Sequence, residues 1–367
     1  MPDAQKPADR WISTTGYTPQ PTGENVLQAA RKRINRLLDY NLPYVVSFSA
    51  GKDSTTVLML SLEQAALRGR LPLQVVFLDE EVLDPDTIAY AEQVRQRPDV
   101  DFKWFCVPIR HTLRARGRSH WYTWDPDERK VWSRDLPAGA ITEVPGTTKD
   151  ASYRDILKAY YRGQKFVCAA GIRARESFNR RRSIVVGGDY IVEDGNCIYA
   201  KPIYDWNADD IWRAIIRFKW PYSKCYEKMR TVGLPLTRQR IGPWGNVAQA
   251  QIMDLWAQFY PDFWQRAIVR LPELRPAAMY GKSKLYRDIL SKPDGLTWQE
   301  YCMRLVEQLD DESQAYWRNW LTNMLARWAQ QSTLPFPQES KTSTLSWKHI
   351  AFRIGKNDRF KGESRDN

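Results

Sequence analysis

This 367-residue chain has few of the residues that build disulfide or metal scaffolds. It contains five cysteines and three histidines, and no two cysteines form a CxxC pair. This spacing argues against a disulfide scaffold, a zinc site or a cysteine-ligated iron–sulfur cluster, so no Fe–S cofactor is expected. The histidines show neither catalytic-triad nor metal-ligand spacing. The residues in question are Cys106, Cys168, Cys197, Cys225, Cys302, His111, His120 and His349.

Long apolar runs are also missing. No stretch approaches the ~18 apolar residues of a membrane span, and the N-terminus lacks the basic-then-apolar order of a secretory signal. We therefore expect a reduced, cytoplasmic protein with no membrane partner. Residues 1–22 carry several Pro, Gly and Thr residues without periodicity, which predicts a flexible arm.

The chain does carry a large excess of positive charge. Its formal net charge is +12 and its pI about 9.4. Such a balance permits DNA, RNA, nucleotides or sulfated compounds as partners, although any one basic cluster can equally be a solvated surface. The clusters are Arg110, Arg114, Arg116 and Arg118; Arg173, Arg175, Arg180, Arg181 and Arg182; and Lys348, Arg353, Lys356, Arg359 and Lys361.

Apolar runs and helical periodicities alternate along the first half of the chain. This alternation predicts a doubly wound parallel α/β sheet whose ligand site lies at the carboxyl ends of the strands. The expected strands are 44–49, 73–78, 102–107 and 165–170, and the expected helices are 24–40, 56–68 and 85–95.

The remaining segments complete the predicted organisation. An aromatic-rich insertion or lid is expected at about 114–164, and residues 184–186 and 197–199 are expected to form a hairpin. Helical spacing dominates from residue 208, at 209–219, 246–259 and 297–329. The predicted domains are a nucleotide-binding α/β domain (23–207), a helical domain (208–330) and a linker with a basic tail (331–367).

Three segments at predicted strand ends carry the chemistry. The first, Ser49-Ala50-Gly51-Lys52-Asp53-Ser54-Thr55, is a small-residue turn between a strand and a helix. Unpaired amides and hydroxyls there favour phosphate, Lys52 adds a mobile positive charge, and Asp53 is suited to a nucleotide-bound metal ion. Ser47, just before the turn, is a further nucleotide-binding candidate. An ordinary α/β turn is the competing interpretation, and a positive φ at Ala50 would cost about 1 kcal/mol.

The other two segments follow later strands. Asp79, in Leu78-Asp79-Glu80-Glu81, is placed to bind Mg²⁺ or a ribose, or simply to cap a helix. Gly171-Ile172-Arg173-Ala174-Arg175-Glu176-Ser177 offers a glycine that lets the backbone approach a ligand. Arg173 and Arg175 are spaced to clamp phosphate or sulfate oxygens, with Glu176 and Ser177 orienting them. The competing interpretation is that Arg175 and Glu176 are ordinary surface residues in the first turn of a helix.

These segments together resemble a known superfamily. Ser49–Thr55 resembles the SGGxDS PP-loop of N-type ATP pyrophosphatases and phosphoadenylyl-sulfate (PAPS) reductases, with Ala50 replacing one glycine. Val76–Glu81 resembles the "V-D-T-G" segment, and Gly171–Ser177 the G-[IL]-R-x-x-E-S motif. Lys201–Trp212 resembles the "P-[IL]-x-x-W-x-x-x-D-[IV]-W" stretch, and Pro221–Tyr226 the "N-P-L-Y" loop.

The C-terminal part resembles a narrower group. Ser346-Trp347-Lys348-His349-Ile350, followed by Lys356-Asn357-Asp358, is similar to the end of PAPS reductase-like proteins of the immunoglobulin-binding regulator A type, which carry a DUF3440 segment. That resemblance implies an adenine nucleotide alpha hydrolase-like (HUP) fold and links to gene regulation beside a ParB-like partner. The cysteine segment E-C-G-L-H of sulfite-forming reductases is missing, which puts thiol-based reduction in doubt.

Three functions remain open at this point. The first is an enzyme that uses Mg²⁺ and cleaves the α–β phosphate bond of ATP, or acts on PAPS, to modify an acceptor such as nucleic acid. There, Ser49, Gly51, Ser54 and Thr55 would hold the leaving phosphates, Lys52 would neutralise charge, Asp53 and Asp79 would bind the metal, and Arg173 and Arg175 would clamp the far phosphate or sulfate. The second is a nucleotide-sensing regulator, and the third is a PAPS reductase using Cys225 or Cys302.

Overall fold

A computed structural model describes residues 24–113, 119–176, 180, 190–236, 238–244, 252–275, 278, 292–339 and 345–355. The predicted N-terminal arm and the predicted strand at 184–186 lie outside these ranges. The contacts divide the chain into two units, one spanning Pro21–Tyr286 and one that contains Arg287–Asn367. Each unit is described by itself.

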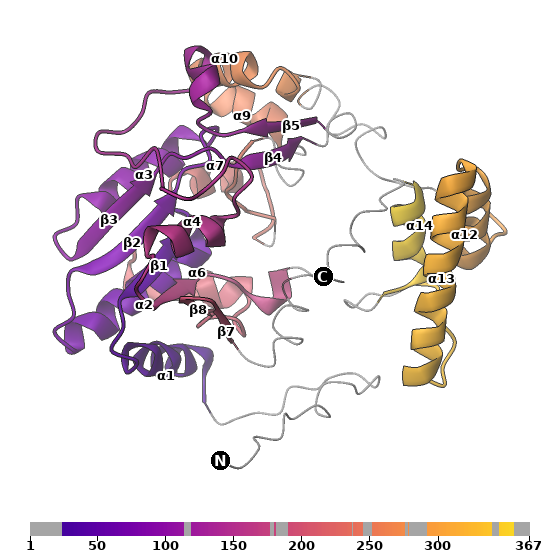
Figure 1. Cartoon of the computed structure of the whole chain (residues 1–367), viewed down its shortest axis with the longest axis horizontal. Coiled ribbons are helices and arrows are strands. Elements are labelled where there is room, and N and C mark those ends of the chain that lie inside the picture. The colour runs from indigo at the N-terminus through magenta and orange to yellow at the C-terminus, as the bar shows by residue number, and fades with distance from the viewer. Residues whose placement is uncertain are drawn as a thin grey trace. The chain divides into compact units, whose positions relative to one another are not determined.

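The first unit is built on a six-stranded sheet (Figure 1). Five strands run parallel, and β7 at one edge runs antiparallel to β8. The order across the sheet is β3 (Val100–Phe105), β2 (Leu73–Leu78), β1 (Tyr44–Phe48), β6 (Phe166–Ala170), β8 (Cys197–Ala200) and β7 (Ile191–Asp194). Because Phe48 is in register with Phe77 and Ser47 with Ala170, the three motif segments leave the sheet at one edge.

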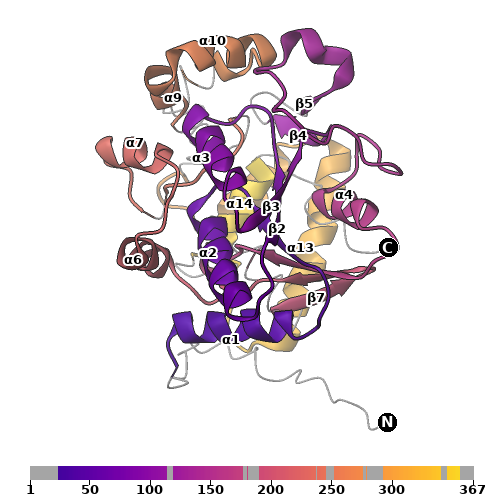
Figure 2. The same ribbon diagram turned by 90° about the vertical axis from the view of Figure 1, so that its left-hand side faces the viewer.

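Helices cover both faces of this sheet, and Figure 2 shows α2 and α3 on one side and α4 on the other. Alternate residues of β1 explain why, since Val46 and Phe48 pack on one face and Val45 on the opposite one. The helices on the first face are α1 (Val26–Leu38), α2 (Lys52–Leu67), α3 (Pro85–Arg95) and α6 (Ala208–Phe218), and α4 (Tyr153–Tyr160) lies on the other. The predicted doubly wound α/β fold is confirmed.

The segment expected as an insertion forms its own small structure. β4 (Arg110–Leu113) and β5 (Ser119–Tyr122) pair as a separate antiparallel hairpin, and the short helix η1 (Pro126–Val131) follows. Trp121 shares a hydrophobic core with α7 (Cys225–Thr231), α9 (Met253–Phe259) and α10 (Pro261–Arg270). The expected boundary between residues 207 and 208 does not coincide with the division into units, because α6 buries Ile211 and Ile215 in the core next to the sheet.

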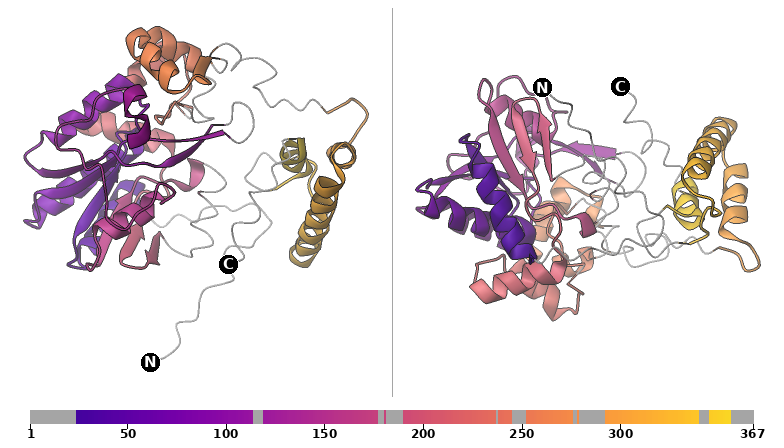
Figure 3. Two further views of the ribbon diagram at one scale, coloured as in Figure 1. Left: turned by 45° about the horizontal axis from the view of Figure 1, so that its top comes forward. Right: turned by 90° about the horizontal axis from the view of Figure 1, so that it is seen from below.

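The described part of the second unit is helical, with the helices α12 (Trp298–Glu307), α13 (Asp311–Gln331) and α14 (Trp347–Gly355) (Figure 3). The helical spacing of 297–329 is divided between α12 and α13, because the Asp310 side chain caps a new helix by accepting the N–H of Ser313. Trp317 and Cys302 lie fully buried in the core of this unit. Within the described residues, no helix has the length and apolar character needed to cross a membrane.

Candidate phosphate-binding site

The turn after β1 has the geometry of an anion-binding loop. Gly51 is the N-cap of α2, and as a glycine it has no side chain with which to cap the helix. The first amides of a helix have no intrahelical acceptor and lie at the positive end of its dipole. Ser49 is exposed, and its Oγ lies 3.1 Å from Ser54 Oγ. Amides and hydroxyls gathered in this way favour phosphate.

At two positions the resembled motifs have a glycine, whereas this protein has a residue with a side chain. Ala50 has φ of +55° and Glu81 has φ of +61°, so both adopt the left-handed conformation that glycine favours. This conformation costs about 1 kcal/mol at each of the two positions. Gly51 has φ of −78°, so that glycine is not required by its backbone conformation.

Three charged residues from two of the motifs form a continuous chain of contacts. The Arg173 guanidinium donates to one oxygen of Asp53, and Lys52 Nζ lies 3.2 Å from the other. Arg173, which follows β6, therefore faces the loop that follows β1. Lys52 is only 3% exposed and also donates to the carbonyl of Gln239 at 2.9 Å. Its ammonium is thus held in place by these contacts, in contrast to the mobile charge expected from the sequence.

Gly171 allows two backbone segments to approach each other closely, and its predicted role at a ligand stays a prediction. A Cβ at this position would lie 2.6 Å from both the carbonyl carbon of Asp53 and the backbone nitrogen of Ser54. The glycine therefore lets the turn after β6 pack directly against the first turn of α2. This close approach is what brings Arg173 to Asp53.

The rest of that third segment is spread over a wider area. Arg175 is exposed on the short helix η2 (Ala174–Glu176). Glu176 pairs with Arg180, and its backbone carbonyl accepts a hydrogen bond from Arg240 at 2.8 Å. Ser177 lies outside the described residues, so its predicted role stays a prediction.

Two candidate hydroxyls do not line the mouth of the loop. Thr55 is fully buried in the first turns of α2, and its amide donates to the carbonyl of Gly51 at 2.9 Å. Ser47 Oγ lies 2.7 Å from the hydroxyl of Tyr153 on α4, which donates to it. The structure thus brings together Ser49, Gly51, Lys52, Asp53, Ser54 and Arg173, and leaves Thr55 and Ser47 beneath them.

Asp79 is completely buried at the end of β2 and both its oxygens have donors. Trp104 Nε1 donates to one oxygen at 2.7 Å; Arg134 and, at 2.9 Å, the amide of Glu81 donate to the other. Asp53 likewise has a cation at each oxygen. In the described part of the chain no group of three or more His, Cys, Asp or Glu side chains is placed to hold a metal ion. Every carboxylate oxygen of Asp79 and Asp53 thus contacts an N–H donor or a cation, and such an environment does not fit a Mg²⁺ site as it stands. The metal-ligand role of the two residues stays a prediction.

The sequence analysis missed the buried ion pair between Glu81 and Arg270. Arg270 Nε lies 2.7 Å from Glu81 Oε1, and the amides of Trp124 and Ser133 also donate to the Glu81 carboxylate. These contacts attach the predicted insertion and α10 to the loop after β2. The only signal in the sequence for this ion pair was Glu81, a charged residue in place of the motif glycine. Its partner Arg270 is 189 residues away, so the sequence did not identify it.

Tyr226 and Gln239 were also missed as neighbours of the loop. The backbone amide of Lys52 donates to the Tyr226 hydroxyl at 2.9 Å, and the tyrosine ring lies 5.6 Å from the ammonium. Tyr226 ends the segment that resembles the "N-P-L-Y" loop. That resemblance predicted a loop of the family, but it did not predict the contact with Lys52. The segment around Gln239 carried no signal.

A histidine–carboxylate pair lies beside the loop after β2. His111 Nε2 is 3.5 Å from a carboxylate oxygen of Glu80, and the imidazole stacks on Trp121. Burial lowers the pKa of His111 to about 4. Burial, together with the charge of Asp79, raises the pKa of Glu80 to about 7. The imidazole is therefore neutral at physiological pH.

All five cysteines are free and buried. Burial holds the pKa of the Cys225 thiol well above its usual range and raises that of Cys302 to about 12. Because the thiolate is the reactive form, neither residue has the environment of a nucleophile.

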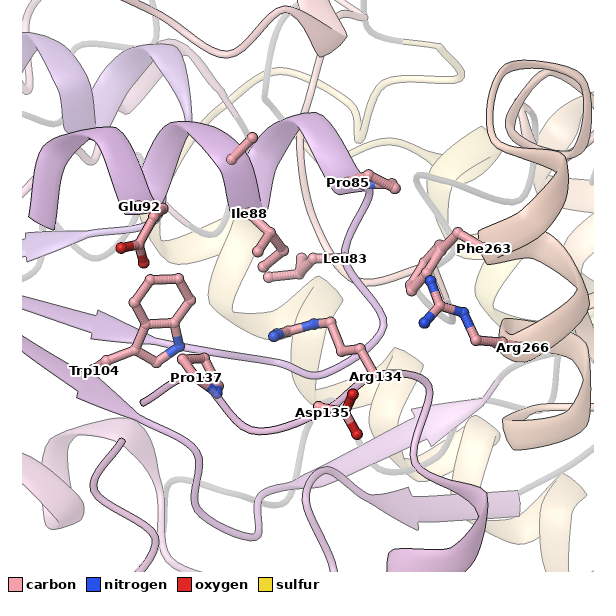
Figure 4. A pocket seen from close by; sticks show the side chains of 11 residues that line it. Leu83, Pro85, Ile88, Glu92, Trp104, Arg134, Asp135, Pro137, Phe263 and Arg266 are labelled. Carbon is pink, nitrogen blue, oxygen red and sulfur yellow. The ribbon is translucent and has the colours of Figure 1, made fainter. Parts of the chain in front are cut away.

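A mostly apolar pocket of about 450 Å³ lies between α3, the end of β3 and α10 (Figure 4). Its walls include Leu83, Ile88, Trp104, Arg134 and Phe263. Trp104 and Arg134 are also the donors to Asp79, so the pocket adjoins the support of the β2 loop. None of the predicted site residues lines it.

The fold and the site define an α/β protein whose candidate ligand loop lies at the carboxyl ends of its parallel strands. Residues 43–242, more than half of the chain, match the phosphoadenosine phosphosulfate reductase domain family. Residues 233–361 match a domain of unknown function, DUF3440. The chain belongs to the phosphoadenosine phosphosulfate reductase domain family, with a DUF3440 segment at its C-terminal side, which confirms the resemblance drawn from the motifs.

Two relatives and two solved structures illustrate the similarity. The uncharacterized protein YbdN of Escherichia coli (strain K12) is 30% identical over 366 residues, covering 91% of this chain and 88% of YbdN. The uncharacterized protein MJ0066 of Methanocaldococcus jannaschii is 27% identical over 187 residues, covering 51% of this chain and 34% of MJ0066.

The solved structures are more distant. The PAPS reductase of Candida auris in a phosphate complex has a TM-score of 0.34 at 12% identity, covering 63% of this chain and 99% of that one. The FMN adenylyltransferase of Candida glabrata has a TM-score of 0.36 at 14% identity, covering 57% of this chain and 62% of that one. The family assignment rests on the sequence matches alone.

Proposed function

We propose that this protein binds an adenine nucleotide at the Ser49–Thr55 loop and cleaves the α–β phosphate bond of ATP, or acts on PAPS, to modify an acceptor. The observation that carries the proposal is the contact between Arg173 and Asp53. It joins two family motifs, which are 120 residues apart in the sequence, into one charged site at the mouth of the loop. Membership of the PAPS reductase domain family supports a nucleotide as the ligand.

Each residue has a definite task in this proposal. The phosphates that leave as pyrophosphate bind to the hydroxyls of Ser49 and Ser54 and to N-terminal amides of α2 other than that of Lys52, which donates to Tyr226. Lys52 and Arg173 neutralise the charge that develops, and they exchange part of their contact with Asp53 for the nucleotide. Arg175, exposed beside them, binds the outermost phosphate or sulfate. Asp79 braces the β2 loop through Trp104 and Arg134, so no step is assigned to a metal ion bound there.

Turnover of ATP labelled in the α-phosphate tests this function. Purified protein should release pyrophosphate and transfer labelled AMP to an acceptor when DNA or RNA is supplied, with and without Mg²⁺. Asp53→Asn should abolish release, because it removes the charge that holds Lys52 and Arg173. Asp39→Asn is the matched control, since Asp39 pairs with Arg68 on the surface and its side chain is 63% exposed. Equal release by wild type and Asp53→Asn would refute the assignment.

A second candidate is a nucleotide-sensing regulator that acts with DNA or a ParB-like partner. One observation favours it, namely that Asp53 contacts both Lys52 and Arg173, so the two cations of the site are paired with a carboxylate of the protein itself. Tight nucleotide binding without pyrophosphate release, under every acceptor tested, would select the regulator over the enzyme.

The weakest candidate is a PAPS reductase. It requires a reactive thiol, and the two cysteines considered for that role are Cys225 and Cys302, both fully buried. Sulfite formation from PAPS that is lost in Cys225→Ser or Cys302→Ser would revive this candidate. Sulfite formation that is undiminished in both variants would exclude these thiols as nucleophiles.

A further inference from the structure

The space next to Gly51 is bounded by two hydroxyl groups from distant parts of the chain. A Cβ at Gly51 would lie 3.3 Å from Ser49 Oγ and 3.6 Å from the hydroxyl of Tyr226. Both hydroxyls therefore border the space that a side chain at Gly51 would enter at the N-terminus of α2, and we call this space the gap. Any residue can adopt the φ of −78° found at Gly51, so the backbone conformation does not require glycine here. We infer that glycine is present because a side chain would enter the gap.

Tyr226 is held firmly in this position. It lies on α7, is 2% exposed, and packs against Trp212 with ring centroids 5.2 Å apart. Its oxygen accepts the backbone N–H of Lys52 at 2.9 Å. A phenol offers one proton in addition to its lone pairs, and it keeps that proton at neutral pH. The N–H of Lys52 uses a lone pair, so the Tyr226 hydroxyl retains its proton as a donor.

We propose that Tyr226 is a phosphate-binding residue of this site, and that a phosphoryl oxygen occupies the gap beside Gly51 between the hydroxyls of Ser49 and Tyr226. The inference rests on the proposed function and adds a phosphate-binding residue from a segment to which that function assigns no role. Accepting the Lys52 amide polarises the phenol, which strengthens the hydrogen bond that it donates to an anion. The ligand is the diphosphate portion of a nucleotide, and free pyrophosphate shares the same chemistry.

The first test measures the affinity of wild-type protein and Tyr226→Phe for inorganic pyrophosphate and for a non-hydrolysable ATP analogue, by calorimetry. Tyr226→Phe keeps the ring and its packing and removes only the hydroxyl. Loss of one hydrogen bond to a charged ligand should weaken both affinities by about tenfold or more. Tyr222→Phe is the matched control, because Tyr222 lies in the same segment and donates to Glu227 at an exposed position. It should leave both affinities unchanged.

The second test fills the gap. Gly51→Ala is compatible with the backbone conformation, and its methyl group would occupy the space between the two hydroxyls. We expect a folded variant, with a circular dichroism spectrum like that of the wild type, whose affinity for pyrophosphate falls by tenfold or more.

The outcomes separate this inference from the proposed function. Binding of pyrophosphate that is equal in wild type, Tyr226→Phe and folded Gly51→Ala overturns the inference and leaves the proposed function standing. No binding of pyrophosphate or analogue by the wild type overturns both. If Tyr226→Phe does not fold, Gly51→Ala alone decides, because unchanged affinity in that variant is incompatible with an occupied gap.

Discussion

The guanidinium of Arg270 on α10 donates to the carboxylate of Glu81, which follows β2, with Nε and Oε1 2.7 Å apart. Both residues are buried, at 6% and 0% exposure. Arg270 also donates to the carbonyl of Tyr122, at the end of the β4–β5 hairpin. One ion pair thus joins the carboxyl edge of the sheet, the insertion and the helices that follow residue 252. The carboxylate of this ion pair belongs to Glu81, which stands where the resembled motif has a glycine. A glycine at this position could not form the ion pair.

Removing the cation from this junction should be strongly destabilising. Arg270→Met leaves the Glu81 carboxylate buried with only amide donors, and an uncompensated buried charge costs about 3–5 kcal/mol. Urea unfolding should show this loss in the free energy of unfolding. Arg266→Met, one turn earlier on the same helix and exposed, should change it by less than about 0.5 kcal/mol. Similar losses in the two variants would show that the ion pair is not the stabilising contact.

Adding one methyl group at Gly171 should disrupt the site. Its Cβ would lie 2.6 Å from backbone atoms of Asp53 and Ser54, which cannot rotate away. We expect Gly171→Ala to lose about 1–3 kcal/mol of stability and to lose pyrophosphate binding, because the turn after β6 carries Arg173. Gly69→Ala is the control, since φ there is +63° but no atom lies within 4 Å of the added group. It should cost about 1 kcal/mol and leave pyrophosphate binding intact. Retained binding in Gly171→Ala would contradict the expected displacement of Arg173.

His111 should make folding sensitive to acid. Burial lowers its pKa from 6.5 to about 4, so the unfolded chain takes up a proton at a higher pH than the folded protein. The stabilising effect of the neutral imidazole is present above pH 6.5 and is lost as the pH falls toward 4. Its size should be on the order of 2 kcal/mol.

The experiment compares free energies of unfolding at pH 7 and pH 4.5 in wild type and His111→Gln. Glu80 acts in the opposite direction, because its raised pKa adds stability as the pH falls through about 7. Asp79, and Arg134 paired with it, are the other charged groups behind Glu80. The glutamine variant keeps these groups, so its smaller loss of stability on acidification isolates the histidine. An identical loss in both proteins would show that His111 is not the titrating group.

The cysteines should be unreactive in the folded protein. All five thiols are buried, and Cys302 also donates to the carbonyl of Trp347 at 3.1 Å. Ellman's reagent should therefore label none of them rapidly under native conditions and all five after denaturation in guanidinium. Rapid labelling of one native thiol that is lost in Cys225→Ser or Cys302→Ser would contradict this expectation and favour the reductase candidate.

Much of the fold could be predicted because it depends on local patterns. The strands at 44–48 and 73–78 and the helix at 85–95 follow from apolar runs and from caps such as Asp84, which accepts the amide of Thr87. The approach of Arg173 to the first loop followed from motif order, because parallel strands share one carboxyl edge. The expected mobility of Lys52 was wrong, since its partner Gln239 lies 187 residues away and carries no pattern.

By itself, the sequence determined the class of fold, the position of the phosphate-binding turn and the candidate residues around it. Each of these depends on neighbouring residues, whose spacing sets period, capping and turn shape. Only the tertiary structure decided which candidates face the turn. It buried Thr55, enclosed Asp79 among donors, packed Gly171 onto α2, and placed Tyr226 beside Gly51. The physical reason is that charge pairing and close packing depend on distances between segments far apart in the chain, and those distances exist only once the sheet and its helices have assembled.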